Sequence, residues 1–220
     1  MTDVGPQTLY IFGAGGHGRE VAWLARRVHP AARLVHLVDD ERFLGEPVND
    51  VPLELVSRAV PGDRTAFVTA VGDAAVRRVA AAALIAAGLR PIALIHPSAD
   101  VTPTARIGTG AVVCAGTFVS DGVEVGEHAI VNVGATVSHD VRLGDYTTLS
   151  PGVHIAGHVL VGPDAFLGIG ASVVNGRPGT PLVIGAGAVV GAGAVVISDV
   201  PAGAVVGGVP ARPLVAKESR

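Results

Sequence analysis

The sequence is poor in several residue types, and each shortage excludes a class of protein. A single cysteine, Cys114, rules out an internal disulfide and fits a reducing compartment. Lys and Arg together number 16 against 19 Asp and Glu, with no basic run, so nucleic acid is not an expected partner. Aromatic residues make up only 4%, so any core must be built from small aliphatic side chains.

Long hydrophobic runs are also missing. The start, MTDVGPQTLYIFG, has no basic segment followed by a long apolar core, so no signal peptide is expected. The most membrane-like stretch, Leu182 to Ile197, is shorter than the roughly 20 residues needed to span a bilayer. We therefore expect a cytoplasmic protein with no membrane partner.

What the sequence does contain is a six-residue repeat that begins at Ala99. Thirteen consecutive sextets, from ADVTPT to ASVVNG, carry Val, Ile or Leu at the third position. The residues RPGTP interrupt the repeat, which resumes as LVIGAG, AVVGAG and AVVISD. This period is typical of a parallel β-helix of hexapeptides, in which one aliphatic side chain per sextet points inward. Three sextets make a coil, so residues three sextets apart should stack at about 4.8 Å.

The N-terminal part, up to His96, follows a different pattern. Strands are predicted at TLYIF, RLVHLVDD, TAFVTAVGD and RPIALIHP, and helices at REVAWLARRV and AAVRRVAAAALIAAG, the second ending at Gly88. Alternating strands and helices indicate a small Rossmann-like parallel α/β domain. We therefore expect this domain over residues 1–96 and the β-helix over residues 97–220.

A glycine turn, GAGGHG, connects the first strand to the first helix and contains Gly13, Gly15 and Gly18 in G-x-G-x-x-G spacing. In that context a helix N-terminus can approach a phosphate. Asp39 and Asp40 end the second strand, near where a dinucleotide fold binds ribose. The segment has room for only one mononucleotide half, so a nucleotide-bearing ligand is favoured over NAD. A purely structural glycine turn is the alternative.

Together these motifs resemble the bacterial sugar acyltransferases of the sialic-acid O-acetyltransferase type. That family includes acetyl-CoA-dependent N-acetyltransferases of nucleotide-linked amino sugars. The resemblance covers nearly the whole chain and rests on IFGAGGHGREV, VDD, AVGDAAVR, LIHPSADV, NVGATVSHDVRLGDY and GVPARPL. It implies a left-handed β-helix that forms a homotrimer, with acetyl-CoA between neighbouring β-helices. The N-terminal domain would hold the nucleotide sugar.

The resemblance also assigns the catalytic residues, with His139 as the general base and Asp140 beside it. Imidazole titrates close enough to neutral pH to remove a proton from an attacking amine, and a carboxylate fixes its tautomer. Gly157 lies one coil, or three sextets, after His139 and would offer its N–H to the oxyanion. His158 lies one coil after Asp140 and is a rival base.

Further binding residues follow from the resemblance. The expected acetyl-CoA-binding residues are Asn132, Thr148, Gly157 and Ile169, and the expected nucleotide-sugar-binding residues are Gly15, His17, Asp39, Asp40 and Gly72. No metal site is expected, because no two of the eight histidines are separated by two full coils, as the zinc enzymes of the β-helix class require. The other histidines are expected at the surface, the domain junction or an interface: His29, His36, His96, His128 and His154.

The leading hypothesis is therefore an acetyl-CoA-dependent N-acetyltransferase that acts on a nucleotide-linked amino sugar for surface polysaccharide or glycan biosynthesis. The alternative is an O-acetyltransferase that acts on a sugar hydroxyl, since one base serves both acceptors. A non-catalytic ligand-binding scaffold is a third possibility, from a different functional class.

Overall fold

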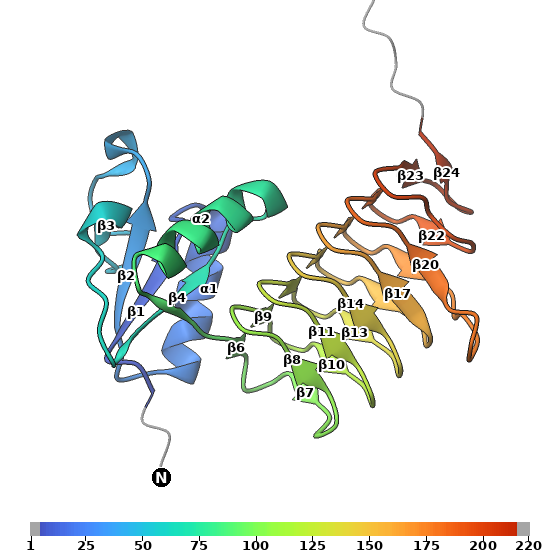
Figure 1. The fold of residues 1–220 in the computed structure, drawn as a ribbon, viewed down its shortest axis with the longest axis horizontal. Coiled ribbons are helices and arrows are strands. Elements are labelled where there is room, and N and C mark those ends of the chain that lie inside the picture. Colours follow the sequence, from blue (N-terminus) through green and yellow to red (C-terminus); the bar gives the residue numbers. More distant parts are fainter. Residues whose placement is uncertain (1–4, 215–220) are drawn as a thin grey trace, which may run out of the picture.

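The structure is a computed structural model that describes residues 5–214, and the N-terminal part forms a parallel sheet between two helices (Figure 1). Its strand order is β3-β2-β1-β4-β5. Helix α1 packs on one face against Leu9 and Ile11, and α2 packs on the other against Tyr10 and Phe12. This alternation along one strand confirms the Rossmann-like prediction. The elements are β1 (Thr8–Phe12), α1 (Gly16–Val28), β2 (Arg33–Val38), β3 (Leu53–Leu55), β4 (Thr65–Thr69), α2 (Ala74–Ala86) and β5 (Arg90–Pro91).

Three short elements in this unit were not predicted from the sequence. They are β3 and the 3-10 helices η1 (Glu41–Phe43) and η2 (Val56–Arg58). None of their residues is fully buried, so no hydrophobic run marks them in the sequence. No helix within residues 5–214 is long and apolar enough to cross a membrane.

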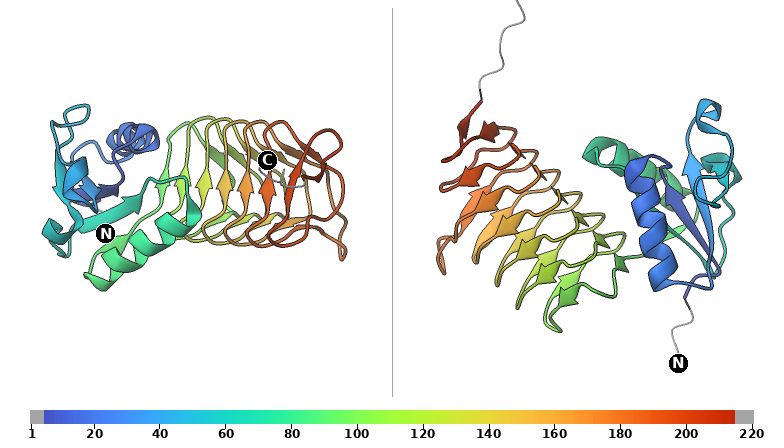
Figure 2. Two further views of the ribbon diagram at one scale, coloured as in Figure 1. Left: turned by 90° about the horizontal axis from the view of Figure 1, so that it is seen from above. Right: turned by 180° about the vertical axis from the view of Figure 1, so that it is seen from behind.

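The second unit is a parallel β-helix whose coils are visible as a regular stack in Figure 2. Sheet 1 contains β7, β10, β13, β16, β19 and β22; sheet 2 contains β8, β11, β14, β17 and β20; sheet 3 contains β6, β9, β12, β15, β18, β21, β23 and β24. The strands are β6 (Leu94–Ile95), β7 (Asp100–Val101), β8 (Arg106–Ile107), β9 (Val112–Val113), β10 (Phe118–Val119), β11 (Glu124–Val125), β12 (Ile130–Val131), β13 (Thr136–Val137), β14 (Arg142–Leu143), β15 (Thr148–Leu149), β16 (His154–Ile155), β17 (Val159–Val161), β18 (Phe166–Leu167), β19 (Ser172–Val173), β20 (Leu182–Ile184), β21 (Val189–Val190), β22 (Val195–Val196), β23 (Val205–Gly207) and β24 (Arg212–Pro213).

The register between coils follows the six-residue repeat. Val119 pairs with Val137, which lies three sextets further along the chain, as predicted. Across the RPGTP insertion Val159 pairs with Leu182, which lies three sextets plus the inserted segment further along. The insertion therefore leaves the coil as a loop, and the strands that follow it resume the same register.

From Ala111 onward each sextet buries two side chains instead of the one that was predicted. The third-position aliphatics form the core as expected. First-position residues such as Ala129, Val141 and Val153 are fully buried too. They lie two positions before the third-position residue and therefore point to the same, inner face of the strand. The abundance of Ala and Val at first positions reflects the limited volume inside the coil.

Three corners connect the sheets. Corner A, between sheets 1 and 2, contains Gly122, Asp140 and His158; corner B, between sheets 2 and 3, contains Gly110, His128, Tyr146 and Asp164; corner C, between sheets 3 and 1, contains Gly116, Gly134, Gly152 and Gly170. All of these residues have positive φ. Glycine adopts that conformation without strain, whereas His and Tyr do so at a cost. Corners A and B nevertheless carry residues other than glycine at these positions, which indicates that their side chains have a role.

The last strand predicted for the N-terminal part lies at the junction of the two units. The single strand predicted over RPIALIHP is divided in two, because β5 pairs with β4 and β6 pairs with β9. Leu94 therefore already belongs to sheet 3 of the β-helix. His96 is buried just after β6, where its ring stacks on Trp23 of α1 at a centroid distance of 5.0 Å.

A column of rings also joins the two units at corner B. Phe67 of β4 stacks on His128 at 6.0 Å, and His128 stacks on Tyr146 of the next coil at 5.1 Å. The Arg78 guanidinium lies 4.0 Å from the Tyr146 ring centroid and forms an ion pair with Asp164. His128 is thus buried at the contact between the units, and its Nδ1 has no hydrogen-bond partner within residues 5–214.

This environment predicts a pH-dependent stability. Burial, followed by the nearby Arg77 cation, lowers the pKa of His128 from 6.5 to about 4. The unfolded chain therefore takes up a proton that the folded chain does not, and stability falls as the pH drops from 6.5 to 4. Over the whole interval from pH 6.5 to pH 4, the free energy of unfolding falls by about 3 kcal/mol. Urea unfolding at pH 7 and pH 4.5 measures the loss. The matched variant His128→Asn, which tolerates positive φ, should lose less; an equal loss in both proteins would contradict the assignment.

Candidate functional site

His139 and Asp140 follow β13 and lie at corner A. Residues that are consecutive on a straight strand point to opposite faces, but Asp140 has a φ of 58°, which turns the chain. As a result His139 Nδ1 lies 2.9 Å from Asp140 Oδ2. Both side chains are 56% exposed, so the imidazole is accessible to a ligand. The structure therefore forms the direct His–carboxylate pair that acid–base chemistry requires.

The rival base, His158, lies next to this pair on the following coil. Its Nδ1 is 3.7 Å from Asp140 Oδ2, beyond hydrogen-bonding distance, and its ring meets that of His139 edge-on at 5.0 Å. Asp140 therefore pairs with His139 in preference to His158. The ligating atoms of these three residues lie within 4.8 Å of one another, and they form the one cluster in residues 5–214 with metal-binding distances. The hydrogen bond of His139 to Asp140 favours an acid–base role.

Gly157 lies directly beneath the His139 ring, as the spacing of one coil predicts. A Cβ added to Gly157 would lie 2.5 Å from His139 Cε1 and 2.7 Å from Nε2, so only glycine fits there. The Gly157 carbonyl accepts a hydrogen bond from Gly176 N–H. The Gly157 N–H, by contrast, has no partner among the described residues. A backbone donor without a partner thus lies beside the basic ring.

The loop of residues 175–181 also leaves from corner A. It closes on itself through paired backbone hydrogen bonds between Arg177 and Thr180 and projects from the coil stack (Figure 1, orange). Gly176 is bonded to Gly157, which itself lies one coil after His139, so the loop begins two coils beyond the His139 pair. This position suits a wall of the groove next to the base.

Asn132 and Ile169 lie at corner C, not at corner A. The Asn132 Oδ1 accepts a hydrogen bond from Val133 N–H, which leaves its amide NH₂ available. Ile169 is 62% exposed two coils further along. One chain therefore does not bring the predicted acetyl-CoA residues at corner C together with His139.

A cavity of about 500 Å³ separates corner C from α1, and its walls come from both units. Asn132 and Cys114 line it from the β-helix, and Arg19, Glu20 and Trp23 line it from the helix. Burial, with a contribution from the Glu20 carboxylate, raises the pKa of Cys114 to about 12, so its thiol stays protonated and is a poor nucleophile. Cys114 is itself partly exposed.

Thr148 lies on sheet 3 at the contact between the units and is only 6% exposed. Its Oγ1 accepts a hydrogen bond from Arg77 Nη2 at 2.9 Å. Together with Gly72 it lines a cavity of about 710 Å³. The predicted cofactor residue Thr148 and the predicted substrate residue Gly72 are therefore neighbours.

The glycine turn forms the floor of a further cavity at the carboxyl edge of the N-terminal sheet. Gly15 caps α1 without a side-chain hydrogen bond, and Gly15, Asp39 and Val71 line a cavity of about 530 Å³. His36 holds the turn from below through Nδ1, 2.8 Å from Gly13 O. His36 is fully buried, so its predicted surface position is wrong. It was misplaced because a histidine inside a buried parallel strand has no distinguishing sequence pattern.

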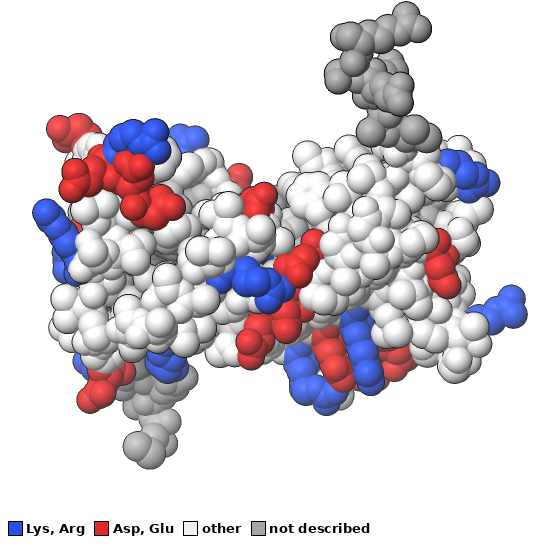
Figure 3. All heavy atoms as spheres, turned by 45° about the horizontal axis from the view of Figure 1, so that its top comes forward, with Lys and Arg blue, Asp and Glu red and all other residues white. Residues whose placement is uncertain are grey.

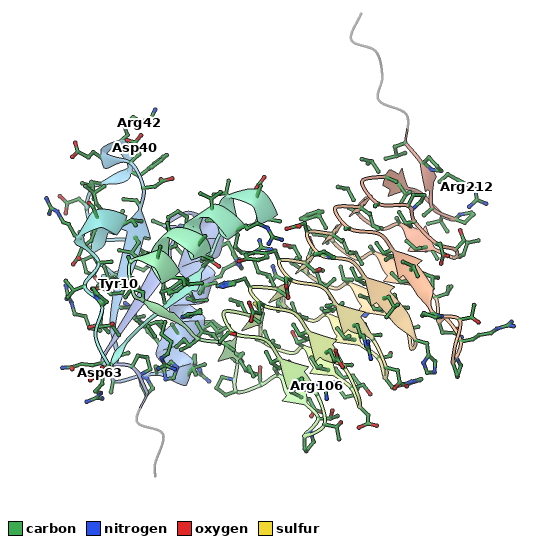
Figure 4. All side chains as sticks on the ribbon, viewed as in Figure 1. Tyr10, Asp40, Arg42, Asp63, Arg106 and Arg212 are labelled. Atoms are coloured by element: carbon green, nitrogen blue, oxygen red, sulfur yellow. The ribbon has the colours of Figure 1, made fainter. Side chains whose placement is uncertain are left out.

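The remaining predicted substrate residues differ in how available they are. His17 Nδ1 is 3.2 Å from Glu20 Oε2, and its buried Nε2 has no partner among residues 5–214. Asp40, by contrast, caps η1 and accepts hydrogen bonds from Arg42 Nε and N, which hold the pKa of its carboxyl below the usual range. Figure 4 shows this pair at the outer end of the N-terminal unit. Asp39 is therefore the carboxylate that lines the cavity, and Asp40 is engaged locally.

Some charged side chains of the β-helix form ion pairs with one another at positions that do not line these cavities. Arg106, Glu124 and Arg142 lie on successive coils of sheet 2 and form an ion-pair ladder. Figure 3 shows basic and acidic side chains alternating along the lower side of the molecule. Most of the rest of the face in that view carries no charged side chain.

Known proteins of similar sequence and structure indicate the family of this chain. Residues 8–84 match the PglD N-terminal domain. GDP-perosamine N-acetyltransferase of Escherichia coli O157:H7 is 33% identical over 209 residues, which cover 92% of this chain and 94% of that protein. The acetyltransferase domain of PglB from Neisseria gonorrhoeae FA1090 in complex with acetyl coenzyme A is 36% identical, with a TM-score of 0.87 over 96% of this chain and 100% of that chain. PerB from Caulobacter crescentus in complex with CoA and GDP-perosamine is 34% identical, with a TM-score of 0.80 over 94% of this chain and 97% of that chain.

Gly157 provides a direct test of the corner A arrangement. In Gly157→Ala the new methyl group must displace the His139 ring, because the contacts would be 2.5 to 2.7 Å. We expect acetyl transfer to fall by about a hundredfold while the fold is retained. Steady-state kinetics and thermal unfolding measure the two effects. Gly45→Ala, at an open position without positive φ and outside both corners, is the control for adding a methyl group to a glycine; equal losses of activity in both variants would refute the special role of Gly157.

Proposed function

Since this chain belongs to the bacterial sugar acyltransferase family that includes GDP-perosamine N-acetyltransferase, we propose that it transfers an acetyl group from acetyl-CoA to the amino group of a nucleotide-linked amino sugar. The observation that carries the proposal is the hydrogen bond of His139 to Asp140 with Gly157 beneath the ring. The reaction belongs in the cytoplasm and supplies surface polysaccharide or glycan synthesis.

His139 acts as the general base in this reaction. Asp140 accepts the Nδ1–H of His139, so the lone pair is on Nε2 and Asp140 stabilises the imidazolium that forms. Nε2 removes a proton from the sugar amine as the amine nitrogen attacks the thioester carbon. The Gly157 N–H donates to the oxygen that becomes negative in the tetrahedral intermediate.

His139 then returns its proton to the leaving sulfur. The C–S bond breaks, the new C–N bond remains, and the proton has moved from nitrogen to sulfur through Nε2. This direct transfer needs no acyl-enzyme. The thiol of Cys114, with a pKa raised to about 12, lies at corner C and is poorly suited to act as a nucleophile.

The N-terminal unit binds the nucleotide sugar. Gly15 presents the open N-terminus of α1, where backbone N–H groups favour a phosphate. Asp39 lies across the same cavity and is placed to accept hydrogen bonds from ribose or the base. His17 offers a ring nitrogen that has no partner among the described residues, at the start of α1. Gly72 lines the neighbouring cavity toward the β-helix.

The active site is completed by a second copy of the chain in a homotrimer. Asn132 and Ile169 at corner C are needed with His139 at corner A, and one chain holds them apart on different corners of the coil. Packing of corner A of one protomer against corner C of the next would join the two sets, with acetyl-CoA between the β-helices. Cyclic threefold symmetry generates three such sites.

An acceptor panel tests the activity. CoA release from acetyl-CoA is measured with UDP-, GDP- and dTDP-linked 4-amino sugars, the matching hydroxyl sugars and free sialic acid. We expect turnover on one nucleotide-linked amino sugar, since a neutral amine is a better nucleophile than a hydroxyl for a single imidazole base. Turnover confined to hydroxyl acceptors would replace the proposal with O-acetyl transfer. Acetyl-CoA binding without turnover on any acceptor would overturn the proposed acceptor class.

Mixed assemblies test the shared site. Chains with His139→Ala and chains with Asn132→Ala should each be nearly inactive alone. When they are co-expressed and purified as mixed trimers, one of the three interfaces has both wild-type residues, so roughly a third of the activity should return. Recovery above the sum of the separate variants supports the shared site. No recovery in verified mixed trimers would place both residues in one chain's site.

A further inference from the structure

We propose that Arg77 is a positioning residue that couples the nucleotide-sugar site to the acyl-transfer coils by holding the Val71–Gly72 turn at a fixed place against corner B. The inference rests on the proposed function for what the two sites bind. Arg77 belongs to the AVGDAAVR segment, of which only Gly72 was assigned a role above.

Arg77 makes every hydrogen bond that its side chain can offer. It projects from α2 and is 0% exposed. A guanidinium has five N–H groups, and here each of them has an acceptor. The acceptors are His128 O at 2.9 Å from Nε, Val71 O at 2.8 Å and Gly72 O at 3.0 Å from Nη1, and Tyr146 O and Thr148 Oγ1, the latter at 2.9 Å, from Nη2.

These acceptors come from both units of the molecule. Val71 and Gly72 form the turn that follows β4, at the carboxyl edge of the N-terminal sheet. His128 and Tyr146 are the corner B residues of two successive coils. One rigid planar group thus sets the distance between the turn and two coils at once. The planarity and fixed spacing of the guanidinium make this possible.

The acceptors are all neutral, which argues against a simple ion pair. The nearby Asp164 carboxylate is bonded to Arg78 instead. Burial of a cation without a bonded carboxylate is costly, and burial lowers the pKa of Arg77 to about 10. The side chain remains charged at neutral pH, and its five hydrogen bonds offset that cost. A lysine has three donors around a point charge and cannot reproduce the arrangement.

The held turn separates the two cavities that the proposed substrate must bridge. Val71 lines the cavity of Gly15 and Asp39, and Gly72 lines the cavity of Thr148. In parallel α/β sheets, ligands bind at this carboxyl edge. A shift of the Val71–Gly72 peptide would therefore change the nucleotide cavity and its distance from the β-helix together, while corner A would keep its geometry.

The experiment compares Arg77→Lys and Arg77→Met with the control His96→Asn. His96 is buried at the other contact between the units, where its ring stacks on Trp23 of α1. It lines neither the cavity of Gly15 and Asp39 nor that of Gly72 and Thr148. The probes are GDP, UDP, dTDP and acetyl-CoA, whose dissociation constants are measured by calorimetry on the full-length protein. KM for each substrate and the melting temperature are measured as well.

We expect both Arg77 variants to weaken binding of the preferred nucleoside diphosphate, and to raise the KM of the nucleotide sugar, by about tenfold. The dissociation constant of acetyl-CoA should change less than about threefold. His96→Asn should lower the melting temperature without weakening nucleoside diphosphate binding more than acetyl-CoA binding. Equal weakening of both ligands in the Arg77 variants would overturn the proposal, and so would a selective loss of nucleoside diphosphate binding in His96→Asn. Arg77 would then only stabilise the contact between the units.

Thr148→Val provides a second variant, which leaves the guanidinium and four of its five acceptors in place and so disturbs the contact less than the Arg77 variants. Loss of one acceptor should raise the KM of the nucleotide sugar in the same direction as the Arg77 variants. If it raises the KM of acetyl-CoA instead, Thr148 is a cofactor residue and the coupling is overturned. Because nucleoside diphosphate binding is measured without turnover, a wrong acceptor class would leave these binding results readable and is distinguishable from failure of the Arg77 proposal.

Discussion

The rest of this structure depends on the register of hydrogen bonds between successive coils, in which each strand is offset from the next by three sextets. Parallel pairing of each short strand with the strand one coil away stacks equivalent positions directly on one another. That register places His139 above Gly157 and Asp140 beside His158. It also aligns the His128 and Tyr146 carbonyls that receive Arg77. The six-residue repeat therefore determines both the geometry around His139 and the contact between the two units. A shift of a single residue between the coils that carry these residues would disrupt both sets of contacts.

Much of the fold follows from sequence because its signals are periodic and local. The third-position aliphatics predict the β-helix, and the glycine turn between a strand and a helix predicts the N-terminal sheet. Counting three sextets onward also predicts the contact between His139 and Gly157. The direct contact of Asp140 with His139 does not follow in this way, since it depends on the positive φ of Asp140 and the length of an aspartate side chain. The left hand of the β-helix came from family resemblance, because a period of six fits either hand.

The features that sequence reasoning missed are those fixed by packing between the units. His128 was expected at the surface or an interface and His36 at the surface or a helix end. Both are buried, His128 in a ring stack and His36 beneath the glycine turn. Arg77 has no sequence pattern that distinguishes it from Arg78, the exposed arginine beside it. Its importance appears only when the acceptors from three chain segments are considered together. Long-range contacts of this kind carry no period, so one sequence does not predict them.

The central claim is that His139 is the base for acetyl transfer. Its most direct test is the turnover number of His139→Ala at saturating acetyl-CoA and amino-sugar substrate, with the dissociation constant of acetyl-CoA measured on the same preparation. The account predicts a fall of about a hundredfold or more in turnover with nearly unchanged binding. A variant that keeps turnover within a few-fold of the wild type, while His158→Ala abolishes it, would transfer the role to His158 and contradict the account.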